Sequence, residues 1–472
     1  MLRDRYAPQD LCALVPKLQL QLDPELTQLD QLLDDDELFQ RVRADLVRRR
    51  PHTATRGRHS TPVEVILRLL VVKRLYHWSY EETERFVGDS LVLRQFCRLY
   101  LEPVPDDTTL IRWANLIGPE TVAALNDRAV ALARALQVTR GRKLRIDGTV
   151  VETNIHHPTD SRILGDGVRV VSRLLRRAKT VLGEQVELGK EAFRTRTRSV
   201  RRLAQQLHRV ARRKGEQAAE ELRQAYDQLI AIARKSRAQA ASVRAALQEQ
   251  AAPAAQRLAE HIDQLLPLID QAVDQATRRV LQGEPVPSEE KLVSLFEPHT
   301  QIIRRHKAGK ATEFGRKLLL DEVEGGSISH FELLDDVGLE HPHLPAHLDV
   351  HQQHFARAPD LLAGDRGLYS PENEAQARAR GVKQIVLPKT GRLSKERQQH
   401  ERQRWFRRGF RFRAGAEGRI HVLKRDYGLD RCRDHGEVGM RRWVGWGIVT
   451  HNLAQIARSQ GRRQVRPRRR AA

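Results

Sequence analysis

The chain contains few cysteines for its length of 472 residues. Its three cysteines, Cys12, Cys97 and Cys432, lie far apart along the sequence. They fit neither a disulfide framework nor the clustered spacing of a zinc site. We therefore expect reduced thiols and a cytoplasmic protein.

Long hydrophobic runs are also missing. The most apolar stretch, 63–75, is interrupted by Arg68 and Lys73, whereas a membrane-spanning helix needs about 20 predominantly apolar residues. The N-terminal sequence MLRDRYAPQD has no apolar segment of the kind found in secretory signals. The sequence thus predicts neither a membrane span nor a secretory signal.

Acidic residues are outnumbered by basic ones, which gives a formal net charge of +23 and a pI near 10.5. Such a charge points to a polyanionic partner, with nucleic acid as the first hypothesis and an anionic membrane surface as the second. The lack of apolar runs weakens the membrane hypothesis. The length is sufficient for two or three domains with a sizeable core.

Proline and glycine become scarce between about 167 and 283, where Ala, Gln, Arg, Glu and Leu dominate. Apolar residues recur there at helical spacing, which predicts a helical insertion broken near Gly215 and Pro253. Its basic residues either contact the DNA backbone or form a solvated helix face, and the sequence leaves both readings open. They are Arg194, Arg196, Arg198, Arg201, Arg202, Arg209, Arg212, Arg213 and Lys214.

The N-terminal region reads as helical. Residues 1–60 contain an acidic helix whose apolar stripe suggests docking, and residues 61–140 contain short helices with clear start signals. These helices suggest a helix-turn-helix-like DNA-binding module that includes Arg112, or else a domain that only supports the core. The stripe comprises Leu26, Leu29, Leu33 and Leu38, and the start signals are capping boxes at 61–64 and 79–82 and a start at Asp106.

Two aspartates end or interrupt predicted strands. Asp147 follows KLRI in a Val/Ile/Thr-rich stretch, and Asp365 follows the apolar run LLAG. Glu417 stands almost alone among basic residues, four positions after Arg413 on a predicted helix. Glu417 is therefore either one member of an exposed ion pair or a metal-binding carboxylate. The strands and helices predict a mixed α/β sheet on which the three carboxylates converge at one edge.

A second candidate group lies just after the first predicted strand. His156, His157 and Asp160 are close in sequence and invite a metal interpretation. Their position in a loop and the absence of a matching histidine pair favour contacts to DNA or a local turn instead.

The layout resembles the RNase H-like core of DDE transposases from bacterial insertion sequences, of an ISNCY-like type. Members of one subgroup carry a Tyr-x2-Arg-x3-Glu-x6-Lys signature, and the matching residues are Phe410, Arg413, Glu417 and Lys424 with every spacing kept. Phe410 replaces the tyrosine, so a hydroxyl contact to phosphate is absent. The helices at 61–117 and the segment 439–458 are similar to the N-terminal and C-terminal helices of the same proteins.

This resemblance implies an RNase H-like mixed sheet flanked by helices, with an N-terminal helical DNA-binding domain and a long all-helical insertion. The expected parts are an acidic helical arm at 1–60, a DNA-binding domain at 61–140, catalytic core at 141–166, the insertion at 167–283, the remaining core at 284–458 and a basic tail at 459–472.

The implied activity is cleavage of the terminal inverted repeats of an insertion sequence and their joining to target DNA. Two Mg²⁺ ions, for which Mn²⁺ is expected to substitute, would be held by Asp147, Asp365 and Glu417, because hard cations prefer carboxylate oxygens. Arg413 and Lys424 would hold phosphates. Phe410, Arg112 and Arg366 complete the expected DNA contacts.

The expected partners are double-stranded DNA, as transposon ends and target, and a second copy of the chain, because synapsis of two ends requires at least a dimer. The expected location is the cytoplasm, in association with the nucleoid. Two rival hypotheses remain: a catalytically inactive, transposase-derived DNA-binding protein, and a nucleoid-associated structural protein that uses the basic helices. Both predict that the three carboxylates are dispensable.

Overall fold

The protein is described here by a computed structural model that covers residues 1–8, 22–50, 52–53, 55–56, 59–183, 188–304, 311–335 and 338–465. Cys12 and the end of the predicted basic tail lie outside these residues. Cys97 and Cys432 are buried free thiols, and burial raises the pKa of Cys97 to about 12. Within the described ranges, no helix is long and apolar enough to span a membrane.

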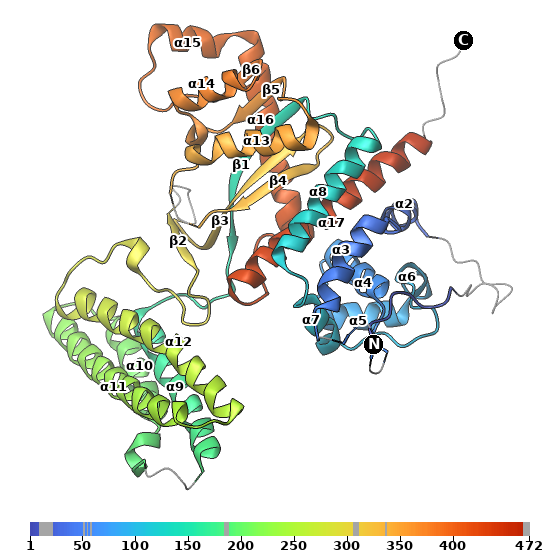
Figure 1. The fold of residues 1–472 in the computed structure, drawn as a ribbon. Helices are drawn as coiled ribbons and strands as arrows, with labels where there is room; N and C mark the ends of the chain where they lie inside the picture. The colour runs from blue at the N-terminus through green and yellow to red at the C-terminus, as the bar shows by residue number, and fades with distance from the viewer. Residues whose placement is uncertain are drawn as a thin grey trace, which may run out of the picture. The chain divides into compact units, whose positions relative to one another are not determined.

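The chain divides into two compact units (Figure 1). One comprises Met1–Glu152 and Arg316–Ala472, and the other comprises Thr153–Gly315. The second unit contains the whole of the predicted insertion, 167–283, together with the residues that flank it.

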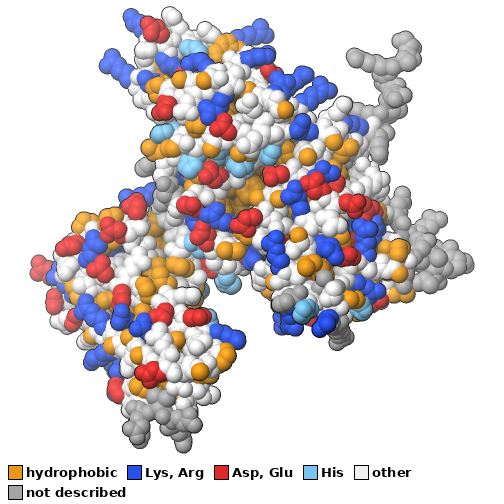
Figure 2. All heavy atoms as spheres, in the orientation of Figure 1, with side chains coloured by type: hydrophobic (Ala, Val, Ile, Leu, Met, Phe, Trp, Pro, Cys, Tyr) orange, Lys and Arg blue, Asp and Glu red, His pale blue; other side chains and the backbone are white. Residues whose placement is uncertain are grey.

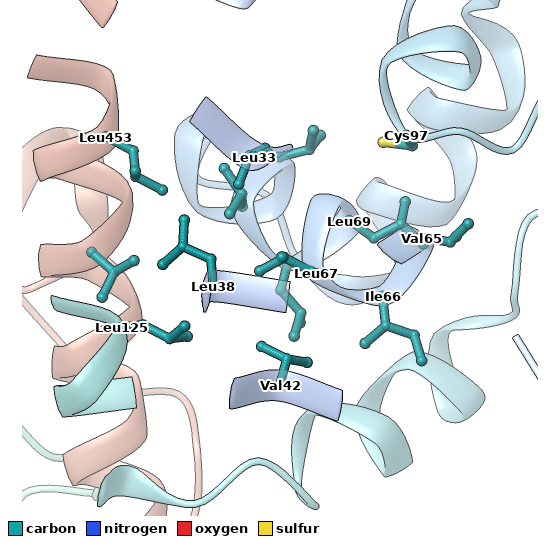
Figure 3. Close-up of a cluster of buried hydrophobic side chains, with 14 of the residues drawn as sticks. Leu33, Leu38, Val42, Val65, Ile66, Leu67, Leu69, Cys97, Leu125 and Leu453 are labelled. Carbon is teal, nitrogen blue, oxygen red and sulfur yellow. The ribbon is translucent and has the colours of Figure 1, made fainter. Parts of the chain in front are cut away.

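Helices from both ends of the chain share one core in the first unit. Figure 3 shows Leu33, Leu38, Leu67 and Leu125 converging with Leu453 from the C-terminal helix. Burial of such leucines stabilises the packing by about 1.5–3 kcal/mol each. The helices are α2 (Pro24–Leu33), α3 (Asp36–Val47), α4 (Val63–Leu75), α5 (Tyr80–Asp89), α6 (Leu91–Phe96), α7 (Asp107–Ala114), α8 (Pro119–Ala135) and α17 (Gly436–Val465).

The N-terminal acidic segment forms two helices, α2 and α3, so the prediction of a single helix is wrong. The Asp35 side chain accepts a hydrogen bond from the backbone N–H of Leu38, which starts a new helix. All four leucines of the predicted stripe are buried in the shared core.

Helix starts agree with the sequence at two of three places. The capping box at Ser79 and Glu82 is present, and the Asp106 side chain accepts from the N–H of Thr109 at the start of α7. The predicted box at 61–64 is wrong because Pro62, in extended conformation, occupies the N-cap. Glu64 therefore lies one position too early to reach back, and its carboxylate pairs with Arg68 instead.

A six-stranded mixed sheet runs through the order β2-β3-β1-β5-β6, with β4 paired to β3. β1 and β5 are parallel, as are β5 and β6, whereas β3 is antiparallel to β2 and β4. The predicted mixed α/β class is confirmed at this level. The strands are β1 (Lys143–Glu152), β2 (Gln301–Arg304), β3 (Thr312–Val323), β4 (Ile328–Leu333), β5 (Leu361–Gly364) and β6 (Gln384–Val386).

Among the residues of the first unit that the structure describes, four further α-helices and two short 3-10 helices accompany the sheet. Among them α16 packs on β1, β5 and β6, and α13 packs on β4. They are η4 (His341–His343), α13 (Leu344–Phe355), η5 (Arg366–Leu368), α14 (Pro371–Ala379), α15 (Lys395–Arg402) and α16 (Arg404–Tyr427).

A buried histidine fixes α13 to the sheet. His347 Nδ1 lies 2.7 Å from Asp321 Oδ1 on β3, and its Nε2 lies 2.9 Å from Glu332 Oε2 on β4. Burial alone would lower the pKa of His347, but the two carboxylates outweigh it and raise the pKa to about 10. The imidazolium therefore donates a hydrogen bond to each strand.

The second unit is a helical bundle with its own core. α9 packs against the other three long helices, and α11 also packs against α10 and α12. The predicted breaks are confirmed, because Gly215 is the N-cap of α11 with φ 108° and Pro253 opens α12. The unit contains α9 (Asp160–Leu182), η1 (Lys190–Phe193), α10 (Thr197–Val210), α11 (Glu216–Gln248), α12 (Pro253–Ala276), the π-helical turn η2 (Thr277–Leu281) and η3 (Ser288–Glu290).

Candidate active site

Asp147 and Asp365 occupy matching positions on neighbouring parallel strands. Ile146 of β1 pairs with Gly364 of β5, so the next residue of each chain segment is an aspartate. Asp147 is only 6% exposed, while Asp365 is partly buried. The sheet register therefore brings two carboxylates of distant sequence together at the end of β5.

Asp365 is held in place by the backbone that follows it. Its Oδ1 accepts hydrogen bonds from the N–H groups of Gly367 at 2.8 Å and Leu368 at 3.2 Å. The carboxylate thus caps the short helix η5. This local bonding fixes the orientation of the side chain beside Asp147.

Arg413 connects Asp147 to Glu417. Its Nη2 lies 3.1 Å from both carboxylate oxygens of Asp147, and its Nη1 lies 3.3 Å from Glu417 Oε1. The Glu417 side chain is 73% exposed, so its carboxylate faces solvent. The i, i+4 ion pair that the sequence offered as one alternative for Glu417 is therefore present, and metal binding by its carboxylate, the other alternative, stays a prediction.

Two glycines let α16 approach the sheet closely enough for these contacts. A Cβ on Gly409 would lie 2.5 Å from Val386 Cγ2, and one on Gly415 would overlap the Arg145 guanidinium. Arg145 donates from Nη1 to the backbone oxygen of Phe412 at 2.6 Å. These contacts fix the rotation of α16, and with it the direction in which Arg413 and Glu417 project.

The pKa of Asp147 is raised above the ordinary value of an aspartate. Burial raises its pKa, Arg413 lowers it and Asp365 raises it, with a net rise to about 6. The carboxylate is therefore mostly ionised at neutral pH but incompletely stabilised. Pairs of carboxylates in this situation are frequent at functional sites.

Carboxylate oxygens are the ligands that Mg²⁺ and Mn²⁺ prefer, and repulsion between Asp147 and Asp365 is what a bound cation would relieve. The donor chemistry therefore fits a hard divalent cation. The arrangement of the side chains differs from that of a metal site, because the Arg413 guanidinium contacts both Asp147 and Glu417. Among the described residues, no three His, Cys, Asp or Glu side chains are grouped closely enough to hold a metal ion.

Glu340 is a site residue that the sequence did not reveal. A Cβ on Gly148 would lie 2.7 Å from Glu340 Oε1, and one on Gly367 would lie 3.5 Å from its Oε2. Its carboxylate thus lies over the backbone that follows each aspartate, and it pairs with Lys317 at 3.3 Å. Glu340 occupies a loop without strand or helix periodicity, so no sequence pattern marks it.

The other predicted contact residues lie at different places. Arg366 directly follows Asp365 and is exposed, and Phe410 is 45% exposed one turn before Arg413. Lys424 is partly buried about 10 Å further along α16 than Glu417, at 1.5 Å per residue. Arg112 lies on α7, where it lines a separate hollow together with Arg3 and Arg49.

The group His156, His157 and Asp160 belongs to the helical unit. Asp160 is buried and accepts hydrogen bonds from Gln275 at 2.6 Å and Arg279 at 2.7 Å. The His157 ring meets the Phe314 ring edge-on, with 5.9 Å between centroids. Asp160 therefore serves the packing of α9 against the end of α12.

Comparison with known proteins gives one match. No curated protein and no solved structure matches the chain. A family model described as a transposase domain (DUF772) matches residues 15–116, which include α2 to α7. The N-terminal helical part of the chain is therefore similar to a transposase domain.

Proposed function

We propose that the chain is a DDE transposase with an RNase H-like core, which cleaves the terminal inverted repeats of its element and joins them to target DNA. The observation that carries the proposal is the pairing of Asp147 and Asp365 on adjacent parallel strands, with Arg413 linking Asp147 to Glu417. The transposase-domain match over residues 15–116 supports it independently.

Asp147, Asp365 and Glu417 are the residues that would hold the metal ions, two Mg²⁺ for which Mn²⁺ substitutes. When bound, such ions activate a water or a 3′-hydroxyl and stabilise the leaving oxygen of a phosphodiester. The raised pKa of Asp147 means that its carboxylate gains more from a cation than an exposed carboxylate would.

Arg413 binds the carboxylates in the free protein and a phosphate in the complex. A guanidinium forms bidentate bonds to phosphate as readily as to carboxylate. Its release from Asp147 on DNA binding would open that carboxylate to a cation. Arg413 thus couples substrate binding to completion of the site.

The remaining contacts position the DNA. Arg366 beside Asp365 and Lys424 on α16 supply positive charge near the scissile phosphate, and Phe410 offers an exposed ring for an unstacked base. The N-terminal helices with Arg112 would bind the inverted repeat. Synapsis of two ends makes the active species a dimer or larger.

The test is Mg²⁺-dependent nicking of a duplex that carries the element's own ends. Glu417→Gln should abolish nicking and leave duplex binding intact, while Glu396→Gln, the same charge change on exposed α15, should cut as the wild type does. If the wild type binds DNA but cuts with neither Mg²⁺ nor Mn²⁺, the chain is a binding protein and the proposal is wrong.

A further inference from the structure

The helical unit carries its charges unevenly. On α10, Val200, Leu203 and Leu207 are buried at helical spacing, and the opposite side of the helix is exposed. No Asp or Glu occurs in α10. The exposed side carries Arg198, Arg201, Arg202 and Arg209.

α9, which packs against α10, continues this pattern. No acidic residue follows Asp166 in the helix. Within the part of the chain that the structure describes, the basic residues of this half form no ion pair, apart from Arg169 with Asp166. The basic residues without an ion pair among the described residues of this half of α9 are Arg173, Arg176, Arg177 and Lys179, and all four are exposed. We use the term α9–α10 basic face for these four residues taken together with the four arginines of α10.

The other two helices are different. Arg237 of α11 pairs with Asp270 of α12 at 2.8 Å, and Arg244 of α11 pairs with Asp263 of α12. On the face of this unit that Figure 2 shows, basic and acidic side chains are interspersed. A surface that needed only solubility would be mixed in this way on every helix.

Keeping like charges together costs stability. Arg198 and Arg202 are four residues apart on α10, as are Arg173 and Arg177 on α9, and each such pair destabilises a helix by roughly 0.2–0.5 kcal/mol. A polyanion bound along the face would remove this repulsion. The uneven distribution is therefore better explained by a ligand than by solvation.

We infer that the α9–α10 basic face binds the phosphate backbone of duplex DNA, an inference that rests on the proposed function. From Arg198 to Arg209 the helix rises about 16 Å, which matches the axial rise of roughly five base pairs. Membrane-surface helices expose an apolar face beside the basic one, whereas the apolar face of α10 is buried in the bundle. DNA is thus the partner that fits.

The test compares two triple variants of the full chain with equal loss of charge. The first replaces Arg198, Arg201 and Arg202 by Gln. The second, matched variant replaces Arg234, Lys235 and Arg257, exposed cations of α11 and α12, by Gln. Affinity for a duplex of unrelated sequence is measured by fluorescence anisotropy from 50 to 300 mM salt, about the range over which counterion release dominates.

The first variant should bind roughly 10- to 100-fold more weakly near 0.1 M salt, with a salt slope reduced by about 0.9 for each lost phosphate contact. The matched variant should bind within about two-fold of wild type. Equal losses in both variants would mean that only net charge matters, and no loss in the first would mean that the face is merely solvated. Either result overturns the inference.

Two further measurements separate the outcomes. If the first variant loses binding to phosphatidylserine vesicles but retains DNA binding, the partner is a membrane and the inference is wrong. Nicking by the wild type is scored in parallel. A wild type that binds but does not cut contradicts the proposed function alone, whereas a first variant that binds and cuts normally contradicts the basic face alone.

Discussion

Two arginine–carboxylate clusters join α16 to the sheet, and they are neutralised to different degrees. In one, Glu322 of β3 accepts from Arg145 at 2.8 Å and from Arg419 at 3.1 Å, and its side chain is only 5% exposed. In the other, Arg413 alone is shared between Asp147 and Glu417, and Asp365 adds negative charge. The first cluster has two arginines for one carboxylate, and the second has one arginine for three.

This difference is what we expect between a cluster that serves only the fold and a cluster that binds a ligand. A buried carboxylate that serves only the fold is most stable when each oxygen has a charged donor, as in Glu322. A carboxylate that must accept a cation or a phosphate-bound ligand has to keep part of its charge uncompensated, as Asp147 does. Substitutions that change the charge balance or the packing of the two clusters test the comparison.

The largest effect should come from breaking the cluster of Arg145, Arg419 and Glu322. Arg145→Met leaves the buried Glu322 with one donor fewer and removes the bond to the Phe412 backbone, so the free energy of unfolding should fall by about 3–5 kcal/mol. Denaturant unfolding measures the loss. A loss below about 1 kcal/mol would show that the cluster is as weakly held as a surface pair.

Removing the shared arginine should affect activity more than stability. Arg413→Gln should reduce nicking by on the order of 10- to 100-fold. The unfolding midpoint should fall to a smaller extent, because Asp147 loses its compensating charge, and duplex binding should weaken only by the loss of one phosphate contact. Because Arg413 lowers the pKa of Asp147, its loss raises that pKa further above about 6. The acidic limb of the pH–rate profile should therefore move to higher pH, and an unchanged limb would contradict this role.

The raised pKa of Asp147 should make the stability of the protein depend on pH. Because its folded pKa of about 6 exceeds the ordinary value of 3.8, the folded state favours the protonated form, and the contribution of Asp147 to stability falls as pH rises from about 4 to 6. Asp147→Asn should therefore be more stable than wild type by about 1–3 kcal/mol at pH 7. The difference should vanish near pH 4. An asparagine variant that is less stable at pH 7 would refute the assignment.

The smallest effects concern the glycines of α16. Gly409→Ala places a methyl group 2.5 Å from Val386 and should destabilise the protein by about 1–3 kcal/mol before a helix-propensity gain of about 1 kcal/mol. Gly418→Ala, on the same helix, has no heavy atom within 4 Å of the added Cβ and should stabilise by about 0.5–1 kcal/mol. Thermal unfolding of the pair checks the close approach, because equal shifts would exclude it.

Sequence patterns predicted what depends on local order. Asp147 and Asp365 could be assigned to predicted strands because apolar runs identify the strands. Parallel strands bring their carboxyl ends to one edge of a sheet, so the two aspartates were expected to lie close together. Arg413 and Glu417 followed from helix spacing. The division of α2 from α3 depends on a single aspartate cap, which a run of Asp34, Asp35 and Asp36 does not identify.

Long-range pairing could not be predicted from one sequence. Glu340, from a loop, lies over the backbone that follows the two aspartates, and His347 binds residues of two strands that lie 15 and 26 positions away in the sequence. Glu64 likewise pairs with Arg98 and Arg5, which are distant in the sequence, as well as with Arg68 on its own helix. Charged side chains pair with the opposite charges that the fold brings close to them. Spacing along the chain alone therefore does not predict these pairs.

The most direct test of the incompletely neutralised site is calorimetric titration of Mg²⁺, repeated with Mn²⁺, into the wild type and Asp147→Asn in the presence of end DNA. The wild type should bind at pH 7.5 and more weakly at pH 5.5, since Asp147 protonates near pH 6 and a metal ligand must be deprotonated. Asp147→Asn should lose this binding at both pH values. Equal binding by both proteins, or none by the wild type, would contradict the account.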